Sequence, residues 1–215
     1  MLNAIRVLAD MLHLASYLIL IYKMRASKSV AGISLKTQAL YLLVFVTRYI
    51  DLPFRFALNY NTPLKIIFIG AAGYIVYLML TEYRSTYDAA FDTFRVEFLI
   101  LAALLASLVY PDRYEFIDGY VWSFSIYLEA TAILPQLFQM TRTGEAETIT
   151  AHYLFCLGSY RALYIINWIY RYATEPGYSD PVAWIAGVVQ TLLYADFFYV
   201  YFTKVLKTRR YKMPV

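Results

Sequence analysis

Cysteine, histidine and charged residues are all scarce in this chain of 215 residues. The single cysteine, Cys156, excludes an internal disulfide framework and a cysteine-based metal cluster. The two histidines, His13 and His152, leave little basis for a zinc site, so we expect no metal and no cofactor. Only 16% of the residues are charged. A soluble domain has roughly a quarter charged residues, so this composition argues against a soluble globular protein.

The chain is instead rich in long apolar stretches. It is 61% hydrophobic and 19% aromatic, with a mean hydropathy of +0.52. A helix needs about 20 mostly apolar residues to cross a bilayer. Such stretches lie near residues 4–22, 37–54, 64–81, 96–110, 119–140, 151–172 and 181–203. The sequence therefore predicts an all-α membrane protein, with seven transmembrane helices in residues 1–203 and a basic tail in 204–215.

Lysine and arginine are distributed unevenly between the predicted loops. They concentrate in the first, third and fifth loops and in the tail, whereas the opposite loops contain only Arg55 and Arg113. Cytosolic loops carry the excess of basic residues in membrane proteins. We therefore expect a lumenal or external N-terminus and a cytosolic C-terminus.

A short internal repeat links two of the spans. Thr37 precedes Arg48 by eleven residues, and Thr150 precedes Arg161 by the same interval. Both pairs open a span that runs from the cytosol outward. Two parallel three-helix repeats, joined by the fourth span, would explain the match. The match is short, and chance is the alternative explanation.

Ionisable residues interrupt the apolar spans at several depths. At bilayer depth such a group costs a few kcal/mol or more unless it is paired or hydrated, and it commonly marks a functional site. A polar cavity inside the helices is therefore expected. The residues concerned are Arg6, Asp10, His13, Arg48, Asp51, Glu129, Arg161, Arg171 and Asp196.

Helix direction places most of the arginines toward the lumenal side. Arg6, Arg48 and Arg161 would line one pocket, with Arg171 at its rim. Arginine stays charged and binds carboxylates with a planar fork. Asp180 and Asp118 at the mouth could accept a positive group. This pattern fits a short peptide that has a free C-terminal carboxylate and internal acids.

Each of these residues also has a structural interpretation. Arg6 with Asp10, and Arg48 with Asp51, could be local pairs on a helix surface. His13 could be an interior histidine or a group that titrates near pH 6.5. Glu129 could accept from a tyrosine hydroxyl, and the tail could simply reflect the positive-inside rule.

Long stretches of the chain resemble the KDEL receptors, which retrieve escaped lumenal proteins from the Golgi to the endoplasmic reticulum. The resemblance runs end to end. The most specific segments are AGIS at 31–34, TRYIDL at 47–52, DTFRVEFL at 92–99, WSFSIYLEATAILPQLF at 122–138, TGEAETIT at 143–150, HYLFCLGSYRALYIINWIYRY at 152–172 and AGVVQTLLYADFFYVYFTKVLK at 186–207.

The resemblance implies a fold and a ligand. The fold is akin to the SWEET transporters and PQ-loop proteins, with Pro135-Gln136 as the PQ dipeptide. The ligand is a C-terminal Lys-Asp-Glu-Leu or His-Asp-Glu-Leu sequence. By position, the ligand-binding residues are Arg6, Arg48, Tyr49, Asp51, Trp122, Arg161, Tyr164, Trp168, Arg171 and Asp180.

The resemblance also implies a pH switch and a coat-binding tail, with cycling between endoplasmic reticulum and Golgi in COPI vesicles. The switch residues are His13, Glu129, Tyr160 and Asp196, and the tail residues are Lys204, Lys207, Arg209 and Arg210. The lumenal loop departs from the family, because Gly119 stands where relatives have an acid and Asp118 lies beside it. The choice between Lys and His at the first ligand position stays open.

A SWEET-like transporter of a small solute is the main alternative. It predicts a neutral pocket rich in asparagine and aromatic groups, and the arginines argue against it. We do not expect an enzyme, because the sequence has no nucleophile–base pair and no metal-ligand spacing such as H-E-x-x-H. A G-protein-coupled receptor would share the span count, but the short loops and intramembrane arginines fit it poorly.

Overall fold

The computed structural model describes residues 3–55, 57, 59–112, 115–143, 145–146, 148–200 and 211–212. The regular secondary structure of these residues is helical apart from one antiparallel pair of two-residue strands, β1 (Glu145–Ala146) and β2 (Tyr211–Lys212). The predicted all-α fold is confirmed. The helices are α1 (Ala4–Ser27), α2 (Leu35–Arg48), α3 (Asn61–Leu80), η1 (Arg84–Thr86), α4 (Val96–Val109), η2 (Phe116–Val121), α5 (Trp122–Thr131), α6 (Leu134–Thr143), α7 (Thr148–Thr174), α8 (Pro181–Leu193) and α9 (Ala195–Val200).

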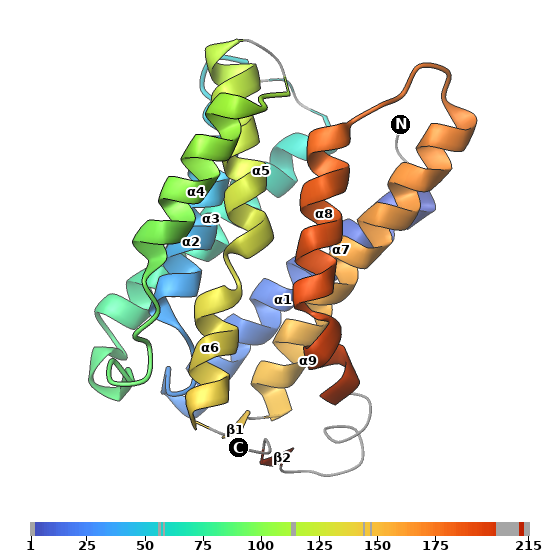
Figure 1. The fold of residues 1–215 in the computed structure, drawn as a ribbon. Helices are drawn as coiled ribbons and strands as arrows, with labels where there is room; N and C mark the ends of the chain where they lie inside the picture. Colours follow the sequence, from blue (N-terminus) through green and yellow to red (C-terminus); the bar gives the residue numbers. More distant parts are fainter. Residues whose placement is uncertain are drawn as a thin grey trace. The chain divides into compact units, whose positions relative to one another are not determined.

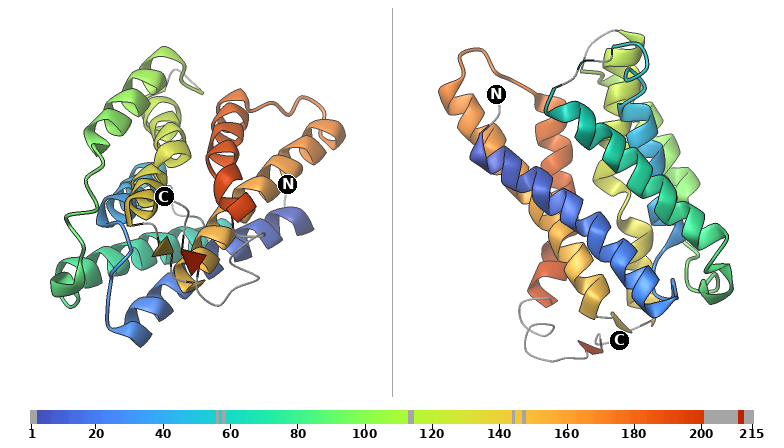
Figure 2. Two further views of the ribbon diagram at one scale, coloured as in Figure 1. Left: turned by 60° about the horizontal axis from the view of Figure 1, so that its bottom comes forward. Right: turned by 180° about the vertical axis from the view of Figure 1, so that it is seen from behind.

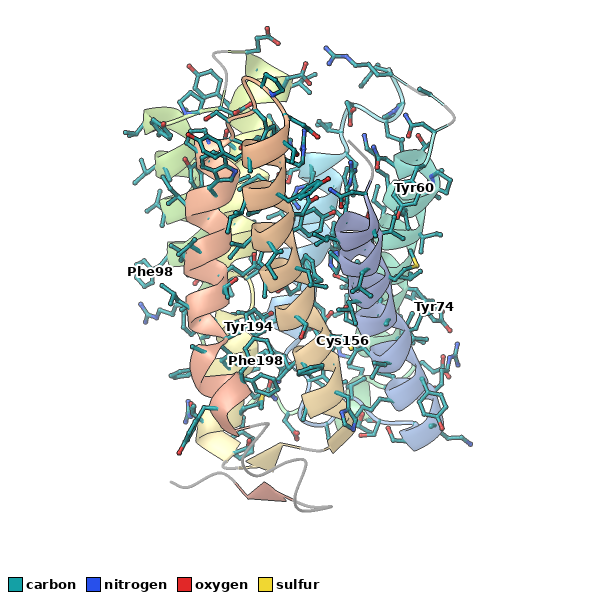
Figure 3. All side chains as sticks on the ribbon, turned by 90° about the vertical axis from the view of Figure 1, so that its right-hand side faces the viewer. Tyr60, Tyr74, Phe98, Cys156, Tyr194 and Phe198 are labelled. Atoms are coloured by element: carbon teal, nitrogen blue, oxygen red, sulfur yellow. The ribbon has the colours of Figure 1, made fainter. Side chains whose placement is uncertain are left out.

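The helices have the character of a multi-pass membrane protein. By length and apolar composition, α1 and α3 can each cross a bilayer, and α4 and α8 are shorter apolar helices. On α4, Leu101, Leu105 and Leu108 are more than half exposed, and Phe98 stands out from the ribbon (Figure 3). Exposed apolar surface of this kind is typical of a surface that contacts a membrane or another protein.

The chain divides into two compact units, which are described separately. Unit 1 comprises Met1–Gly32 and Met140–Val215, and unit 2 comprises Ile33–Gln139. In unit 1, α1 packs on α7 and α7 on α8, whereas in unit 2, α5 packs on α2 and α2 on α3. Each unit thus combines the first span of one predicted repeat with the second and third spans of the other. The α4 connector packs on α5 in unit 2.

Unit 1 is held by close helix contacts. Asn3 caps the start of α1, and its side chain accepts from the backbone N–H of Arg6. Helix α1 then runs along α7 (Figure 2). A Cβ on Gly187 of α8 would lie 2.5 Å from the ring of Trp168 on α7, so only glycine permits this approach. Where α8 gives way to α9, Tyr194 and Phe198 pack at Gly158 of α7 (Figure 3).

In unit 2, the predicted fifth span is not one continuous helix. Residues 119–140 were predicted as a single span, but a π-helical turn, η2, leads into α5, which ends before α6 begins (Figure 1). Pro135 explains the break, because proline lacks an N–H and restricts the residue before it. After the break, Gln136 forms hydrogen bonds with residues at the start of α2. It donates its backbone N–H to Thr37 Oγ1 at 2.9 Å, and its Oε1 accepts from the N–H of Ser34 at 2.9 Å.

A buried carboxylate organises the loops at the same end of α2. Asp92 accepts from Ser34 Oγ at 2.9 Å, from the backbone N–H of Lys36 at 3.2 Å and from Tyr87 Oη at 2.7 Å. Burial raises the pKa of Tyr87, and the hydrogen bond to Asp92 raises it further. A buried carboxylate is stable when its oxygens are hydrogen-bonded in this way. The network therefore fixes where α2 starts and, through its length, where Arg48 lies.

Candidate functional site

Arg48 is the centre of the polar site in unit 2. It is the last residue of α2 and reaches toward α5. Its Nε lies 3.1 Å from Ser125 Oγ, one Nη lies 3.0 Å from the Ser125 carbonyl, and the other forms an ion pair with Glu129. Ser125 and Glu129 are four residues apart and so share one face of α5. The Glu129 side chain is only 1% exposed, which makes this a buried ion pair.

The alternative of a local pair between Arg48 and Asp51 is not observed, because Arg48 pairs with Glu129 and Asp51 has another partner. Lys65 Nζ, on α3, lies 3.3 Å from Asp51 Oδ2 and 3.4 Å from Oδ1. The same ammonium group stands 5.4 Å above the ring of Tyr49, which follows α2. Lys65 is not among the predicted site residues, so its pairing with Asp51 is a finding of the structure.

A second exposed ion pair lies in the loops of unit 2. Arg55 Nη1 is 2.5 Å from Asp118 Oδ2 on η2. This hydrogen bond raises the pKa of the Arg55 guanidinium, and the charge of Asp118 raises it further. Arg55 therefore stays charged at every working pH. Trp122, another predicted ligand contact, begins α5 next to η2, and its carbonyl accepts from Ser125 Oγ at 2.6 Å.

Arg161 is the corresponding arginine of unit 1. It lies in α7 and is 6% exposed. Its guanidinium donates to Tyr160 Oη at 3.2 Å. Its central carbon lies 5.1 Å from the Tyr160 ring and 6.0 Å from the Trp168 ring, within the range of cation–π attraction. The predicted residues Tyr160, Arg161 and Trp168 thus form one cluster.

Asp10 links α1 to α7 in the same unit. It accepts a hydrogen bond from Tyr164 Oη. Arg6 Nε lies 3.9 Å from Asp10 Oδ2, so the alternative of a local pair between Arg6 and Asp10 is confirmed. Above this point Asn3 Nδ2 donates to Asn167 Oδ1 at 2.6 Å. The contacts fix the N-terminal half of α1 against α7.

His13 is buried at the α1–α7 contact, and Tyr160 faces it directly. The two rings are parallel, with an interplanar angle of 1° and centroids 3.9 Å apart. The ring of Tyr17, one turn along α1, lies 5.6 Å from His13. The structure therefore brings two of the four predicted switch residues together. Glu129, a third, is paired with Arg48.

The predicted rim residues make contacts near the end of α7. Arg171 binds Glu175 Oε2 through Nε and Nη2, both at 2.9 Å, and lies 3.7 Å over the Tyr178 ring. The hydrogen bond from Arg171 lowers the pKa of Glu175. Asp180 caps α8, since its Oδ1 accepts from the N–H of Ala183 at 3.1 Å.

An apolar groove of about 270 Å³ lies beside Trp168 on α7 and α8. Its lining has no charged side chain, so it does not suit a carboxylate ligand. The lining residues are Ile165, Trp168, Ile169, Tyr172, Trp184 and Val188. The remaining predicted residues fall outside what the structure describes: the side chain of Asp196, and Lys204, Lys207, Arg209 and Arg210.

Comparison with known proteins places the chain in a family. The model of the "ER lumen protein retaining receptor" family matches residues 29–171. ER lumen protein-retaining receptor 2 of Danio rerio is 53% identical over 213 residues, covering 99% of both chains. ER lumen protein-retaining receptor erd-2.2 of Caenorhabditis elegans is 56% identical over 209 residues, covering 97% of both. The receptor of Drosophila melanogaster is 50% identical over 212 residues, covering 99% of both. This chain therefore belongs to the ER lumen protein-retaining receptor family.

Proposed function

We propose that this receptor binds the C-terminal Lys-Asp-Glu-Leu or His-Asp-Glu-Leu signal of endoplasmic reticulum residents in the Golgi and returns them in COPI vesicles. Family membership supports a receptor for lumenal proteins and not an enzyme. One structural observation carries the choice of ligand. An arginine at the same repeat position lies in the helices of both units, Arg48 beside α5 and Arg161 among aromatic rings.

The ligand chemistry follows from the two arginines. A guanidinium presents several N–H groups in a plane and binds a carboxylate through two of them at once. Arg48 and Arg161, together with Arg6, would hold the terminal carboxylate and the acidic side chains of the peptide. In this proposal Tyr49 and Tyr164 lie along the backbone of the ligand peptide. Arg171, beside Trp168, binds the outer of the two acidic side chains of the ligand. Asp51, Trp122 and Asp180 face its amino end.

The pH response is assigned to His13. His13 stacks on Tyr160 and lies near Tyr17. The other charged and titratable groups in contacts on the same two helices are Asp10, Arg6, Arg161 and Tyr164. Protonation adds a positive charge to a cavity that receives an anionic ligand. Binding then favours protonated His13, and by linkage acid favours binding. Cargo would be bound in the acidic Golgi and released at neutral pH.

The cytosolic signal would follow from the same event. Protonation would rearrange contacts of Glu129 and Tyr160 and shift the first and last spans, with Asp196 linking the core to the tail. The basic residues Lys204, Lys207, Arg209 and Arg210 would then be available to the coat.

A titration of purified receptor with labelled peptides tests this proposal. The peptides end in His-Asp-Glu-Leu or in the same four residues in scrambled order, measured at about pH 5.5 and about pH 7.5 to bracket the histidine range. We expect binding only of the ordered signal, and tighter binding at the lower pH. Equal binding of the scrambled peptide would contradict the assigned ligand, and equal binding at both pH values would contradict the switch.

A further inference from the structure

Two acids near the lumenal end of unit 2, Asp51 and Asp118, already have a basic partner. Asp51 is paired with Lys65 at 3.3 Å, and Asp118 with Arg55 at 2.5 Å. The Arg55 side chain is 63% exposed and that of Asp118 is 26% exposed. An incoming positive group therefore meets the Arg55 guanidinium as well as the carboxylate that this guanidinium occupies.

The Arg55–Asp118 pair lies within reach of a ligand held at Arg48. Asp118 is on η2, which leads directly into α5, where Ser125 and Glu129 bind Arg48. Those residues are seven and eleven positions further along, which is roughly 10–16 Å at the helical rise. Four extended residues span about 13 Å. On the proposed function, a peptide anchored at Arg48 by its terminal carboxylate thus brings its first residue to the level of Asp118.

The charges at this level decide which first residue is favoured. The ammonium group of a lysine at the first position is attracted by the nearby carboxylate. It is repelled by the guanidinium, which lies at a comparable distance. Arg55 remains charged at every working pH, and Asp118 already accepts its hydrogen bond. The repulsion from Arg55 then offsets much of the attraction to Asp118, because the two opposite charges are adjacent and both are partly exposed to solvent and salt.

We propose that Arg55 is a specificity-determining residue of this receptor. By occupying Asp118 it removes the preference for a positively charged first residue, so that signals beginning with a neutral residue bind about as well as those beginning with lysine. The inference rests on the proposed function, and it deepens it by assigning the outermost ligand position to the Arg55–Asp118 pair.

The test compares two N-acetylated peptides, Lys-Asp-Glu-Leu and Ala-Asp-Glu-Leu, on the full-length receptor. In the natural protein we expect dissociation constants within about twofold of each other. In Arg55→Ser the lysine peptide should gain about three- to fivefold over the alanine peptide, which is the size expected for an exposed charge pair. Arg55→Lys keeps the charge and should keep the natural ratio. Asp118→Asn should turn the ratio against lysine.

Arg84→Ser is the matched control. It removes the same charge from unit 2, but Arg84 lies beyond the far end of α3 from Lys65, so the ratio should stay unchanged. A strong preference for lysine in the natural protein, or the same ratio in Arg55→Ser, would overturn the role of Arg55 while leaving signal binding intact. If neither peptide binds, or amidated peptides bind equally well, the proposed function fails and this inference fails with it.

Discussion

The two units place equivalent arginines in different surroundings. In unit 2, Arg48 is tied to a carboxylate and a serine on α5. In unit 1, Arg161 lies on the faces of Tyr160 and Trp168, while Asp10 of α1 is bound by Tyr164 and approached by Arg6. The same repeat position therefore supports a buried ion pair in one unit and an aromatic cage in the other. We infer that Arg48 contributes to both stability and binding, whereas Arg161 contributes mainly to binding.

The largest expected effect is on stability in unit 2. Glu129→Ala would leave the Arg48 guanidinium without its buried carboxylate partner, and breaking a buried ion pair costs about 3–5 kcal/mol. The unfolding temperature of the purified receptor should therefore fall. The double variant Arg48→Met with Glu129→Met should recover most of the loss, because no charge is then buried alone. An unfolding temperature unchanged by Glu129→Ala would show that the pair has no structural role.

The next effect is on binding in unit 1. Arg161→Lys keeps the charge but removes the planar fork. We expect peptide affinity to fall by about 2–5 kcal/mol, as for loss of a buried charged contact, with little change in unfolding temperature. If stability fell more than affinity did, Arg161 would be a structural residue like Arg48 and the contrast between the units would disappear.

The pH dependence of peptide affinity tests the role of His13 in the same unit. In the natural protein, affinity should rise as pH falls through the histidine range, by up to about tenfold per pH unit for one linked proton. His13→Gln cannot titrate, so its affinity should be nearly independent of pH over that range. Peptide titrations at several pH values measure this slope. A full slope in His13→Gln would move the sensor to another residue.

The smallest expected effect is a difference in stability between variants of Thr37 and Thr150, the two threonines of the short internal repeat. Thr37 Oγ1 accepts from the N–H of Gln136 at the break after α5. Thr150 Oγ1 is buried and makes no hydrogen bond among the described residues. Thr37→Val should therefore destabilise the receptor by about 1 kcal/mol, whereas Thr150→Val should be neutral or slightly stabilising. Equal losses in the two variants would mean that the repeats are supported alike.

Sequence alone predicted the helices better than their contacts. Hydropathy placed the spans, because each helix must satisfy its own backbone and present apolar side chains to lipid. The pairing of Arg6 with Asp10 was foreseeable because four residues make one helical turn. The same reasoning offered Asp51 for Arg48 and was wrong, because a nearby helix supplied Glu129 and left Asp51 to Lys65.

Other contacts had weaker signals or none. Arg171 with Glu175 has the four-residue spacing and could have been found. Ser125 precedes Glu129 by four residues, but nothing local relates either to Arg48, 77 residues before Ser125. Arg55 with Asp118 joins two loops 63 residues apart. Pro135 is a local signal for the break at Ala132–Ile133, because proline restricts the backbone that precedes it.

The central claim of the proposed function is that guanidinium groups bind the terminal carboxylate of the ligand, and amidation of the peptide tests it most directly. Affinities of the free acid and the C-terminal amide are compared in the natural receptor and in Arg161→Lys. We predict a large loss on amidation in the natural receptor, about 2 kcal/mol or more, and a smaller loss in the variant, because part of the contact is already gone. Equal affinities of acid and amide in the natural receptor would contradict the account.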